Sequence, residues 1–512
     1  SKNFLNLIIL INMEYYLAID IGTSEIKVVL FDKKFNLKIK QNCRNNVVYT
    51  SDGRSEVDMQ DLWKRCKNLI FNIFKKHKNF SSKIICVGIT ANMVGLWPID
   101  NNGKPVRKAI LWNDNRTKNL IDKLRQKESK LFHKIFLESG SVMQFGCTIP
   151  LIKWFEKNEN NKFKKTKWFL TCKDWIRFKL TNEIANDYTE TVVAPGSAIK
   201  INRSEKIFKL FKLSKASIYK LPVIKKSDSI GGFVTKKASK ETSIKLGTPV
   251  SIGAGDVPTS VIGLGAIENK NAATIFGTTI HNCYVSTKPL FKPKDIGLLF
   301  YAPNNTWLKT MINVAGTMNL EWVIKNFFDI KLYKKNKTKY INLLEKIISQ
   351  KPIGSHGLIY LPYINYGGVI APFFNEEAKG VFFGINHNHD KYDILRSVYE
   401  GVSLSIVDCY RSLNMKIDKL LLAGGGSKSK IWSQMISDSL GIRVLVPKGE
   451  EFGAKGAAII ASVAKYKKNS NYKLQNKLKI YKHYLPNKTN SKQYNELFKK
   501  YKSLSRKLFI DE

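Results

Sequence analysis

Two stretches of the chain share one pattern of apolar and polar positions. Residues 15–32 (YYLAIDIGTSEIKVVLFD) place apolar, β-favouring runs on both sides of a Gly-Thr-Ser turn, and residues 273–285 (ATIFGTTIHNCYV) repeat this arrangement around Gly-Thr-Thr. Apolar runs separated by a short polar turn with glycine predict a β-hairpin. Two such hairpins half a chain apart indicate a duplicated domain, although so short a match also arises by chance.

Strand-like and helix-like patterns alternate elsewhere in the chain. Residues 84–90 (IICVGIT) predict a buried strand, and residues 58–74 carry apolar side chains at helical spacing. Residues 420–423 predict another short buried strand, followed by three glycines and a helix that ends near Gly441. Strands that alternate with helices predict the α/β class.

Composition bounds the size of the protein and the class of its partners. The chain has 512 residues, 43% of them hydrophobic, which is enough for two large domains with ordinary cores. Its 85 Lys and Arg oppose 41 Asp and Glu, for a formal net charge of +44. Only 12 of the 85 are Arg, and lysines occur in every region. Because nucleic-acid modules usually cluster their charge and use Arg for bidentate contacts, we expect a compositional bias and no specific nucleic-acid partner.

The cysteines and apolar runs suggest a cellular compartment. Seven cysteines are scattered without a C-x-x-C motif, which is typical of a reducing cytosol. No apolar run reaches about 18 residues, so we expect no membrane span and a cytoplasmic protein. Residues 1–12 are expected to be an N-terminal extension before a true start at Met13. A signal peptide is the less favoured reading, because a basic region and a cleavage site are lacking.

Two glycine-rich turns are candidate phosphate-binding loops. Glycine lets the backbone approach a phosphate closely, and Thr or Ser adds a hydroxyl donor. The candidate residues are Gly22, Thr23, Ser24 and Lys27 in the first hairpin and Gly277, Thr278 and Thr279 in the second. Asp20, at a strand end, is a candidate ligand for Mg²⁺. Ordinary hairpin turns are the alternative, and no P-loop motif is present.

Two further glycine-rich segments carry candidate chemistry. Asp256 ends the segment Gly-Ala-Gly-Asp after an apolar strand, where a carboxylate is well placed to accept a proton from an attacking hydroxyl. An Asp in an ordinary turn is the alternative. Gly424, Gly425 and Gly426 with Ser427 open a helix and predict a flat surface for a nucleotide base and ribose, although such turns also form for packing alone.

Polar residues that suit a polyol follow the strand at 84–90. Hydroxyl groups require carboxylate and amide acceptors and Arg donors beside an aromatic wall. The candidates are Asn92, Met93, Val94, Trp112, Asp114 and Arg116. A surface loop with a structural Trp is the alternative. Residues 387–390 (HNHD) look like a metal cluster, but their polar surroundings and their isolation from other His or Cys favour a solvated loop.

Taken together, these motifs resemble the FGGY family of carbohydrate kinases over about residues 15–504. The most specific match is the segment at 380–385 (GVFFGI) followed by residues 393–400 (DILRSVYE). The motifs DIGTS-x-x-K, W-x-D-x-R, GAGD, GTT and AGGGS-x-S accompany it in the order that the family shows. Chance is a poor explanation for this joint occurrence.

The resemblance implies a fold and a division of the chain. We expect two ribonuclease-H-like, actin-like ATPase domains with an ATP cleft between them, which agrees with the duplicated hairpins. A sugar-binding N-terminal domain with the catalytic base is expected at 13–262, a nucleotide-binding C-terminal domain at 263–470 and a helical tail at 471–512.

The resemblance also implies roles for individual residues. Asp256 would be the catalytic base, Asp20 would belong to the first phosphate and Mg²⁺ loop, and Gly316 would border the nucleotide. ATP, Mg²⁺ and a small sugar or polyol are the expected ligands. No membrane partner is expected, and relatives are often dimers, so a homodimer is a further expectation.

The chain looks most like the xylulokinase and pentulose-kinase branch. That branch often has Gln-Met-His-Gly where residues 92–95 here read Asn-Met-Val-Gly, so a histidine contact to the sugar is missing. We expect ATP-dependent phosphorylation of a primary hydroxyl of a xylulose-like ketopentose. An erythritol- or glycerol-like sugar alcohol, or another ketose, is the alternative acceptor. A non-catalytic nucleotide-binding sensor on the same fold is the alternative of another class, against which the intact Asp256 and both phosphate loops argue.

Overall fold

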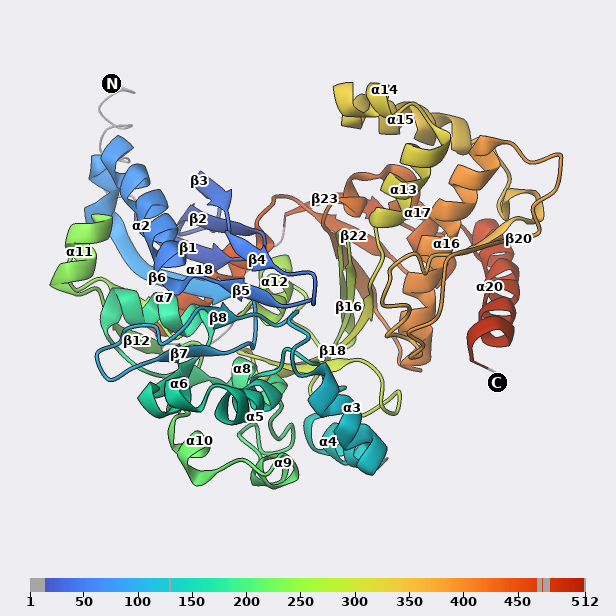
Figure 1. Ribbon diagram of the computed structural model, residues 1–512. Coiled ribbons are helices and arrows are strands. Elements are labelled where there is room, and N and C mark those ends of the chain that lie inside the picture. Colours follow the sequence, from blue (N-terminus) through green and yellow to red (C-terminus); the bar gives the residue numbers. More distant parts are fainter. Residues whose placement is uncertain (1–13, 129, 467–471, 473–478, 511–512) are drawn as a thin grey trace, which may run out of the picture.

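The computed structural model describes residues 14–128, 130–466, 472 and 479–510. The extension expected at 1–12, and part of the tail expected at 471–512, lie outside these residues. The described residues form two lobes, each built around a seven-stranded sheet (Figure 1). Among the described helices, none has the length and apolar character needed to cross a bilayer.

The first sheet is formed by the N-terminal half of the chain. In spatial order its strands are β12 (Ile230–Phe233), β13 (Pro249–Ser251), β6 (Ile84–Ala91), β1 (Tyr15–Ile21), β2 (Glu25–Asp32) and β3 (Leu37–Arg44), with β14 (Ala254–Gly255) paired to β6. Strand β1 is antiparallel to β2 and parallel to β6. The hairpin predicted at 15–32 and the buried strand predicted at 84–90 are therefore confirmed.

The second sheet repeats this arrangement. In spatial order its strands are β17 (Leu298–Ala302), β18 (Thr306–Asn313), β16 (Ile280–Ser286), β15 (Asn271–Phe276), β21 (Lys419–Ala423), β22 (Val444–Pro447) and β23 (Ile480–Tyr484). Strand β15 is antiparallel to β16 and parallel to β21, as β1 is to β2 and β6. The predicted duplication is thus present in the strand order of both sheets, and the α/β fold class is confirmed.

Helices cover both sheets. Those of the first half are α2 (Met59–Lys76), α3 (Lys118–Lys127), α4 (Leu131–Ser139), α5 (Thr148–Asn158), α6 (Asn160–Lys165), α7 (Cys172–Thr181), α8 (Tyr188–Val193), α9 (Glu205–Leu210), α10 (Lys215–Tyr219), α11 (Lys236–Thr242) and α12 (Asp256–Leu264). Those of the second half are α13 (Met318–Phe327), α14 (Ile330–Lys335), α15 (Lys337–Ile348), α16 (Lys391–Ser412), α17 (Lys430–Leu440), α18 (Phe452–Tyr466) and α20 (Lys488–Phe509).

Short strands form four smaller sheets away from the two large ones. They are β4 (Val47–Tyr49), β5 (Ser55–Val57) and β8 (Ala109–Ile110), then β7 (Trp97–Ile99) with β9 (Trp168–Leu170), β10 (Asn186–Asp187) with β11 (Ile224–Lys225), and β19 (Ile359–Leu361) with β20 (Val381–Phe383).

The end of the chain belongs to the second lobe. Strand β23 pairs antiparallel with β22, so this segment contributes a strand as well as a helix. Helix α20 buries Tyr494, Leu497 and Tyr501 in the main apolar core of that lobe. Helical spacing in the sequence shows that these three side chains share a face, but it does not show what that face covers.

Helix α18 comes from the second half of the chain but packs on the first sheet. Its alanines share a buried cluster with side chains of β1, β2 and β6, and Figure 1 shows it inside the lobe of the blue strands. Glycines allow this contact: a Cβ on Gly88 would lie 2.2 Å from the carbonyl oxygen of Ala457, and one on Gly456 would lie 1.9 Å from that of Thr259. The loop that enters α18 is thereby held against the end of β1.

Candidate functional site

A cavity of about 660 Å³ lies between the two sheets. Its volume is ordinary for a site that binds a small molecule. Its lining includes Asp20, Lys27, Ser260, Gly424, Gly425, Ser427, Lys428, Lys448, Glu451 and Gly453. The structure therefore brings the Asp and Lys of the first predicted loop together with the glycines that were predicted to hold a nucleotide.

Asp20 stands opposite Lys27 in the register of β1 and β2. Burial raises the pKa of Asp20 to about 6, against the lowering effect of Lys27. A Cβ on Gly453 would lie only 2.8 Å from Oδ2 of Asp20, so this glycine keeps the carboxylate accessible. Carboxylate oxygen is the ligand type that Mg²⁺ prefers, and Mg²⁺ usually takes few protein ligands and keeps several waters. Asp20 is thus the residue of this cavity that would hold a magnesium ion.

Glu451 is a residue of this cavity that the sequence motifs did not identify. Its Oε2 lies 2.9 Å from Nζ of Lys27, and its Oε1 lies 2.8 Å from Nζ of Lys40 in β3. Its φ of 57° places it in the left-handed region at the start of α18. In the sequence, Glu450 and Glu451 stand just before a glycine-rich helix. This position alone does not identify Glu451 as a site residue, because its partners Lys27 and Lys40 lie far away in sequence.

Asp256 is the first residue of α12 and follows β14, whose Ala254 pairs with Thr90 of β6. The turn before it requires glycine: Gly253 has a φ of +78°, and a Cβ there would lie 2.2 Å from the carbonyl oxygen of Ile89. Burial and the nearby Asp20 raise the pKa of Asp256 to about 7. A base with this pKa is well matched to proton transfer near neutral pH.

Backbone hydrogen bonds from Gly316 and Thr317 hold the second predicted phosphate loop in place. The N–H of Gly316 donates to the carbonyl oxygen of Thr278 at 2.6 Å, and the N–H of Thr317 donates to that of Gly277 at 2.9 Å. A Cβ on Gly316 would lie 2.5 Å from the carbonyl oxygen of Gly277, so only glycine allows this approach. Thr278 and Thr279 are exposed. Their hydroxyls are therefore free to meet a ligand.

The first predicted phosphate loop contacts a residue of the predicted polyol site. The N–H of Gly22 donates to the carbonyl oxygen of Glu25 at 2.8 Å and closes the turn, leaving Ser24 exposed. Nε1 of Trp112 donates to Oγ1 of Thr23 at 2.9 Å. This hydrogen bond thus links the predicted phosphate loop to the predicted polyol site.

The three glycines after β21 have different environments. A Cβ on Gly424 would lie 2.5 Å from the carbonyl oxygen of Phe276, and one on Gly426 would lie 2.3 Å from the ring of Phe276. A Cβ on Gly425 would meet no atom within 4 Å. The hydroxyl of Ser427 donates to the carbonyl oxygen of Gly424 at 2.8 Å. Gly424 and Gly426 therefore serve packing, and Gly425 leaves open space in the cavity.

Residues 92–94 lie beside the segment that carries Asp256. A Cβ on Gly255 would lie 2.4 Å from the thioether of Met93. Nδ2 of Asn92 donates to the carbonyl oxygen of Ile21 at 3.1 Å, and its Oδ1 is buried with no hydrogen-bond partner among the described residues. The backbone N–H of Val94 donates to Oε2 of Glu190 at 2.8 Å.

Asp114 and Arg116 form a buried pair. Nε and Nη2 of Arg116 donate to the two carboxylate oxygens of Asp114 at 2.7 and 2.8 Å, and Nη2 also reaches Glu56 at 2.6 Å. The N–H of Ser55 donates to Asp114 as well. Both carboxylate oxygens of Asp114 are thus engaged within the protein. Nη1 of Arg116 has no partner among the described residues and is the group of this pair that could meet a ligand.

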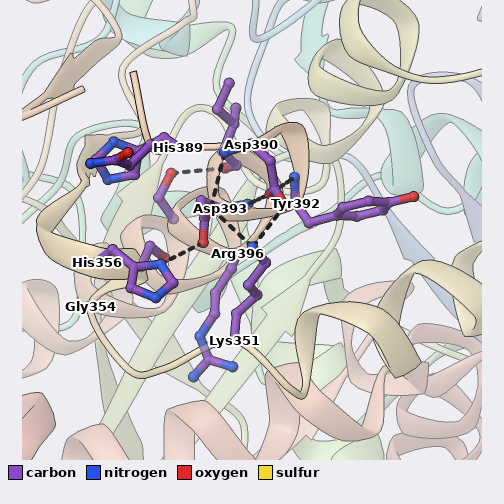
Figure 2. Close-up of polar contacts among 12 residues, drawn as sticks. Lys351, Gly354, His356, His389, Asp390, Tyr392, Asp393 and Arg396 are labelled. Carbon is purple, nitrogen blue, oxygen red and sulfur yellow. Dashed lines mark hydrogen bonds and ion pairs between the residues drawn. The ribbon is translucent and has the colours of Figure 1, made fainter. Parts of the chain in front are cut away.

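Polar contacts connect the start of α16 to Lys351 and His356, as Figure 2 shows. Asp390 caps α16 and accepts from the N–H groups of Tyr392 and Asp393. Asp393 in turn lies 3.0 Å from Nζ of Lys351 and 3.0 Å from Nδ1 of His356. Among the described residues, no group of three or more His, Cys, Asp or Glu is arranged to hold a metal ion. In the loop at 387–390, His387, Asn388 and Asp390 are exposed, which agrees with the solvated loop expected there.

Two family models match most of the chain. The models of the N-terminal and C-terminal domains of the FGGY family of carbohydrate kinases match residues 15–263 and 272–465. A probable L-xylulose kinase of Haemophilus influenzae is 26% identical over 503 residues, which cover 96% of this chain and 98% of that protein.

Solved structures share the fold along nearly the whole chain. A ligand-bound xylulose kinase from Lactobacillus acidophilus has a TM-score of 0.88 at 22% identity, covering 97% of this chain and 98% of its own. A glycerol kinase from Plasmodium falciparum, solved with ADP, has a TM-score of 0.84 at 21% identity, covering 96% of this chain and 98% of its own. At these identities the similarity shows the two-domain fold.

Proposed function

This chain belongs to the FGGY family of carbohydrate kinases, and we propose that it transfers the γ-phosphate of ATP to a primary hydroxyl of a xylulose-like ketopentose. The position of Asp256 carries the proposal. Its carboxyl group, with a pKa raised to about 7, begins α12 close to Asp20, and Asp20 lines the cavity between the two sheets. The similarity to a protein named probable L-xylulose kinase along 96% of the chain supports the acceptor class.

The proposed reaction is an in-line phosphoryl transfer. Asp256 accepts the proton of the sugar hydroxyl. At the same time the oxygen of that hydroxyl forms a bond to the γ-phosphorus, and the bond from that phosphorus to the ADP oxygen breaks. Hydroxyls and backbone N–H groups of the two loops, at Thr23, Thr278 and Thr279, bind the phosphate oxygens. Lys27 supplies a positive charge beside them, where charge develops in the transition state.

Asp20 is the residue that would hold a magnesium ion, because its carboxylate stays accessible next to Gly453. When bound, Mg²⁺ supplies positive charge that neutralises the phosphates. Gly425 and Ser427, which also line the cavity, would border the nucleoside.

A sugar alcohol or another ketose is the second candidate acceptor. It is favoured by Val94, an apolar and buried residue at the position where the xylulokinase branch often has histidine. Loss of this imidazole removes a polar contact and changes which hydroxyl pattern the site accepts.

The test is a coupled assay of ADP release with MgATP over a panel of ketoses and polyols. We expect at least one ketopentose or polyol to stimulate turnover, and Asp256→Ala to reduce that turnover by roughly 10²–10⁴-fold with its fold intact. Circular dichroism and the melting temperature control for folding. Stimulation by none of the acceptors, or near wild-type turnover of the folded variant, would refute the proposal.

A further inference from the structure

Glu190 is a buried acid that none of the motifs identifies. It lies in α8, and its side chain is 1% exposed. The residue before it touches the catalytic segment: Oγ1 of Thr189 accepts a hydrogen bond from the N–H of Gly255 at 3.0 Å, directly before Asp256. Oε2 of Glu190 accepts from the N–H of Val94 at 2.8 Å. Glu190 therefore joins the segment of the base to the loop predicted to bind the sugar.

One carboxyl oxygen of Glu190 is left unused. Its Oε1 is buried and has no hydrogen-bond partner among the described residues. Lys173 is the nearby cation, but its Nζ already lies 2.7 Å from Asp174 and 2.9 Å from Asp187. Burial raises the pKa of Glu190 well above its usual range. A carboxyl oxygen without a partner can form a hydrogen bond with a hydroxyl group of a ligand.

Buried polar groups nearly always have partners in folded proteins, so an exception calls for an explanation. A bound ligand provides one here. In the loop next to Glu190, Val94 has an apolar side chain and a φ of 56°, which is unusual for a β-branched residue. Oδ1 of Asn92, in the same loop, also lacks a partner among the described residues.

We propose that Glu190 is a specificity-determining residue of the sugar site, whose free carboxyl oxygen hydrogen-bonds a hydroxyl group of the acceptor. This inference rests on the proposed function and deepens it. It assigns to α8 the polar contact that a histidine at position 94 would otherwise make.

The experiment compares wild type with Glu190→Ala, Glu190→Gln and a control, Thr191→Val. Thr191 is the next residue of α8, is also buried, and its hydroxyl likewise lacks a partner among the described residues. ADP release is measured at saturating MgATP with D-xylulose, L-xylulose, D-ribulose, erythritol and glycerol. Binding of each acceptor without ATP is measured from the shift that it produces in the melting temperature.

We expect Glu190→Ala to raise KM for the preferred acceptor about tenfold, the effect of one lost hydrogen bond, with KM for ATP unchanged. The ratio of kcat/KM between acceptors should change, and Glu190→Gln should retain part of the preference because its amide still forms a hydrogen bond. Thr191→Val should behave as wild type.

An equal fall in kcat/KM for all acceptors would show a purely structural role for Glu190, provided that the ratios of kcat/KM between acceptors and the melting-temperature shifts stay unchanged. If Glu190→Ala fails to fold, the isosteric Glu190→Gln gives the same comparison of ratios. Failure of the proposed function is a separate result, because wild type itself would then respond to none of the five acceptors.

Discussion

Burial and the neighbouring carboxylate of Asp20 together raise the pKa of Asp256 to about 7. The two acids are close because Asp20 and Ala254 are both in register with Thr90, from opposite sides of β6. Only the ionised form of Asp256 can accept the proton of the acceptor. We therefore expect kcat/KM for the acceptor to fall about tenfold for each pH unit below this pKa, as a pH profile would show.

Removing the charge of Asp20 should shift the acidic limb of the pH profile, the range in which kcat/KM falls with decreasing pH. Asp20→Asn takes away a like charge, so the pKa of Asp256 should fall and the limb should shift to lower pH. The absolute rate should fall as well, since Asp20 is the proposed ligand of Mg²⁺, but the position of the limb is independent of that loss. A limb that stays near pH 7 in the variant would mean that another group controls the profile.

Asp256 should also destabilise the folded protein at neutral and alkaline pH. An Asp titrates near about 3.9 in an unfolded chain, and Asp256 titrates near about 7 when folded. The stabilisation of the folded state by the protonated carboxyl is therefore fully present below the pKa of the unfolded state. It is lost as the pH rises through the pKa of the folded state. Asp256→Asn should raise the melting temperature by a few degrees at pH 8 and change it little at pH 4. Equal gains at both pH values would contradict this origin.

Local patterns predicted much of the fold, and they predicted the residues that we propose for the catalytic centre. Both hairpins, the strand before Asn92 and the Gly-Ala-Gly-Asp turn are encoded in short runs of residues, so their chemistry is visible in the sequence. Glu451 and Glu190 were missed because their partners, Lys27 and Val94, lie far away along the chain. Only the packing of α18 and α8 on the first lobe brings them together.

Asp114 illustrates a different limit of sequence reasoning. Its residue type suits a polyol, but both of its oxygens are occupied by Arg116 and by the N–H of Ser55. A motif shows which groups are present. It does not show which of their hydrogen bonds the folded chain itself uses.

Lys27 should support ATP binding in a way that Lys40 does not. Both lysines contact Glu451, but Lys27 lines the cavity and Lys40 is not among its lining residues. We expect Lys27→Met to lower kcat/KM for ATP by about 10- to 100-fold, because a cation next to the phosphates is lost, with KM for the acceptor little changed. Lys40→Met is the matched control and should stay within about twofold of wild type. Equal losses in the two variants would point to the ion pair with Glu451, and would remove Lys27 from contact with phosphate.

Substitutions at Gly424 and Gly425 should distinguish a role in packing from a role in nucleotide binding. Gly424 has a φ of +92°, and a Cβ there would lie 2.5 Å from the carbonyl oxygen of Phe276, so Gly424→Ala should destabilise the protein by about 1–3 kcal/mol. Gly425 has an ordinary helical φ of −60°, and its Cβ would meet no atom within 4 Å. Gly425→Ala should therefore keep the melting temperature of wild type but raise KM for ATP, since the new methyl group enters the cavity. Thermal unfolding and steady-state kinetics of the two variants measure both effects. An unchanged KM for ATP in Gly425→Ala would place the nucleoside elsewhere in the cavity.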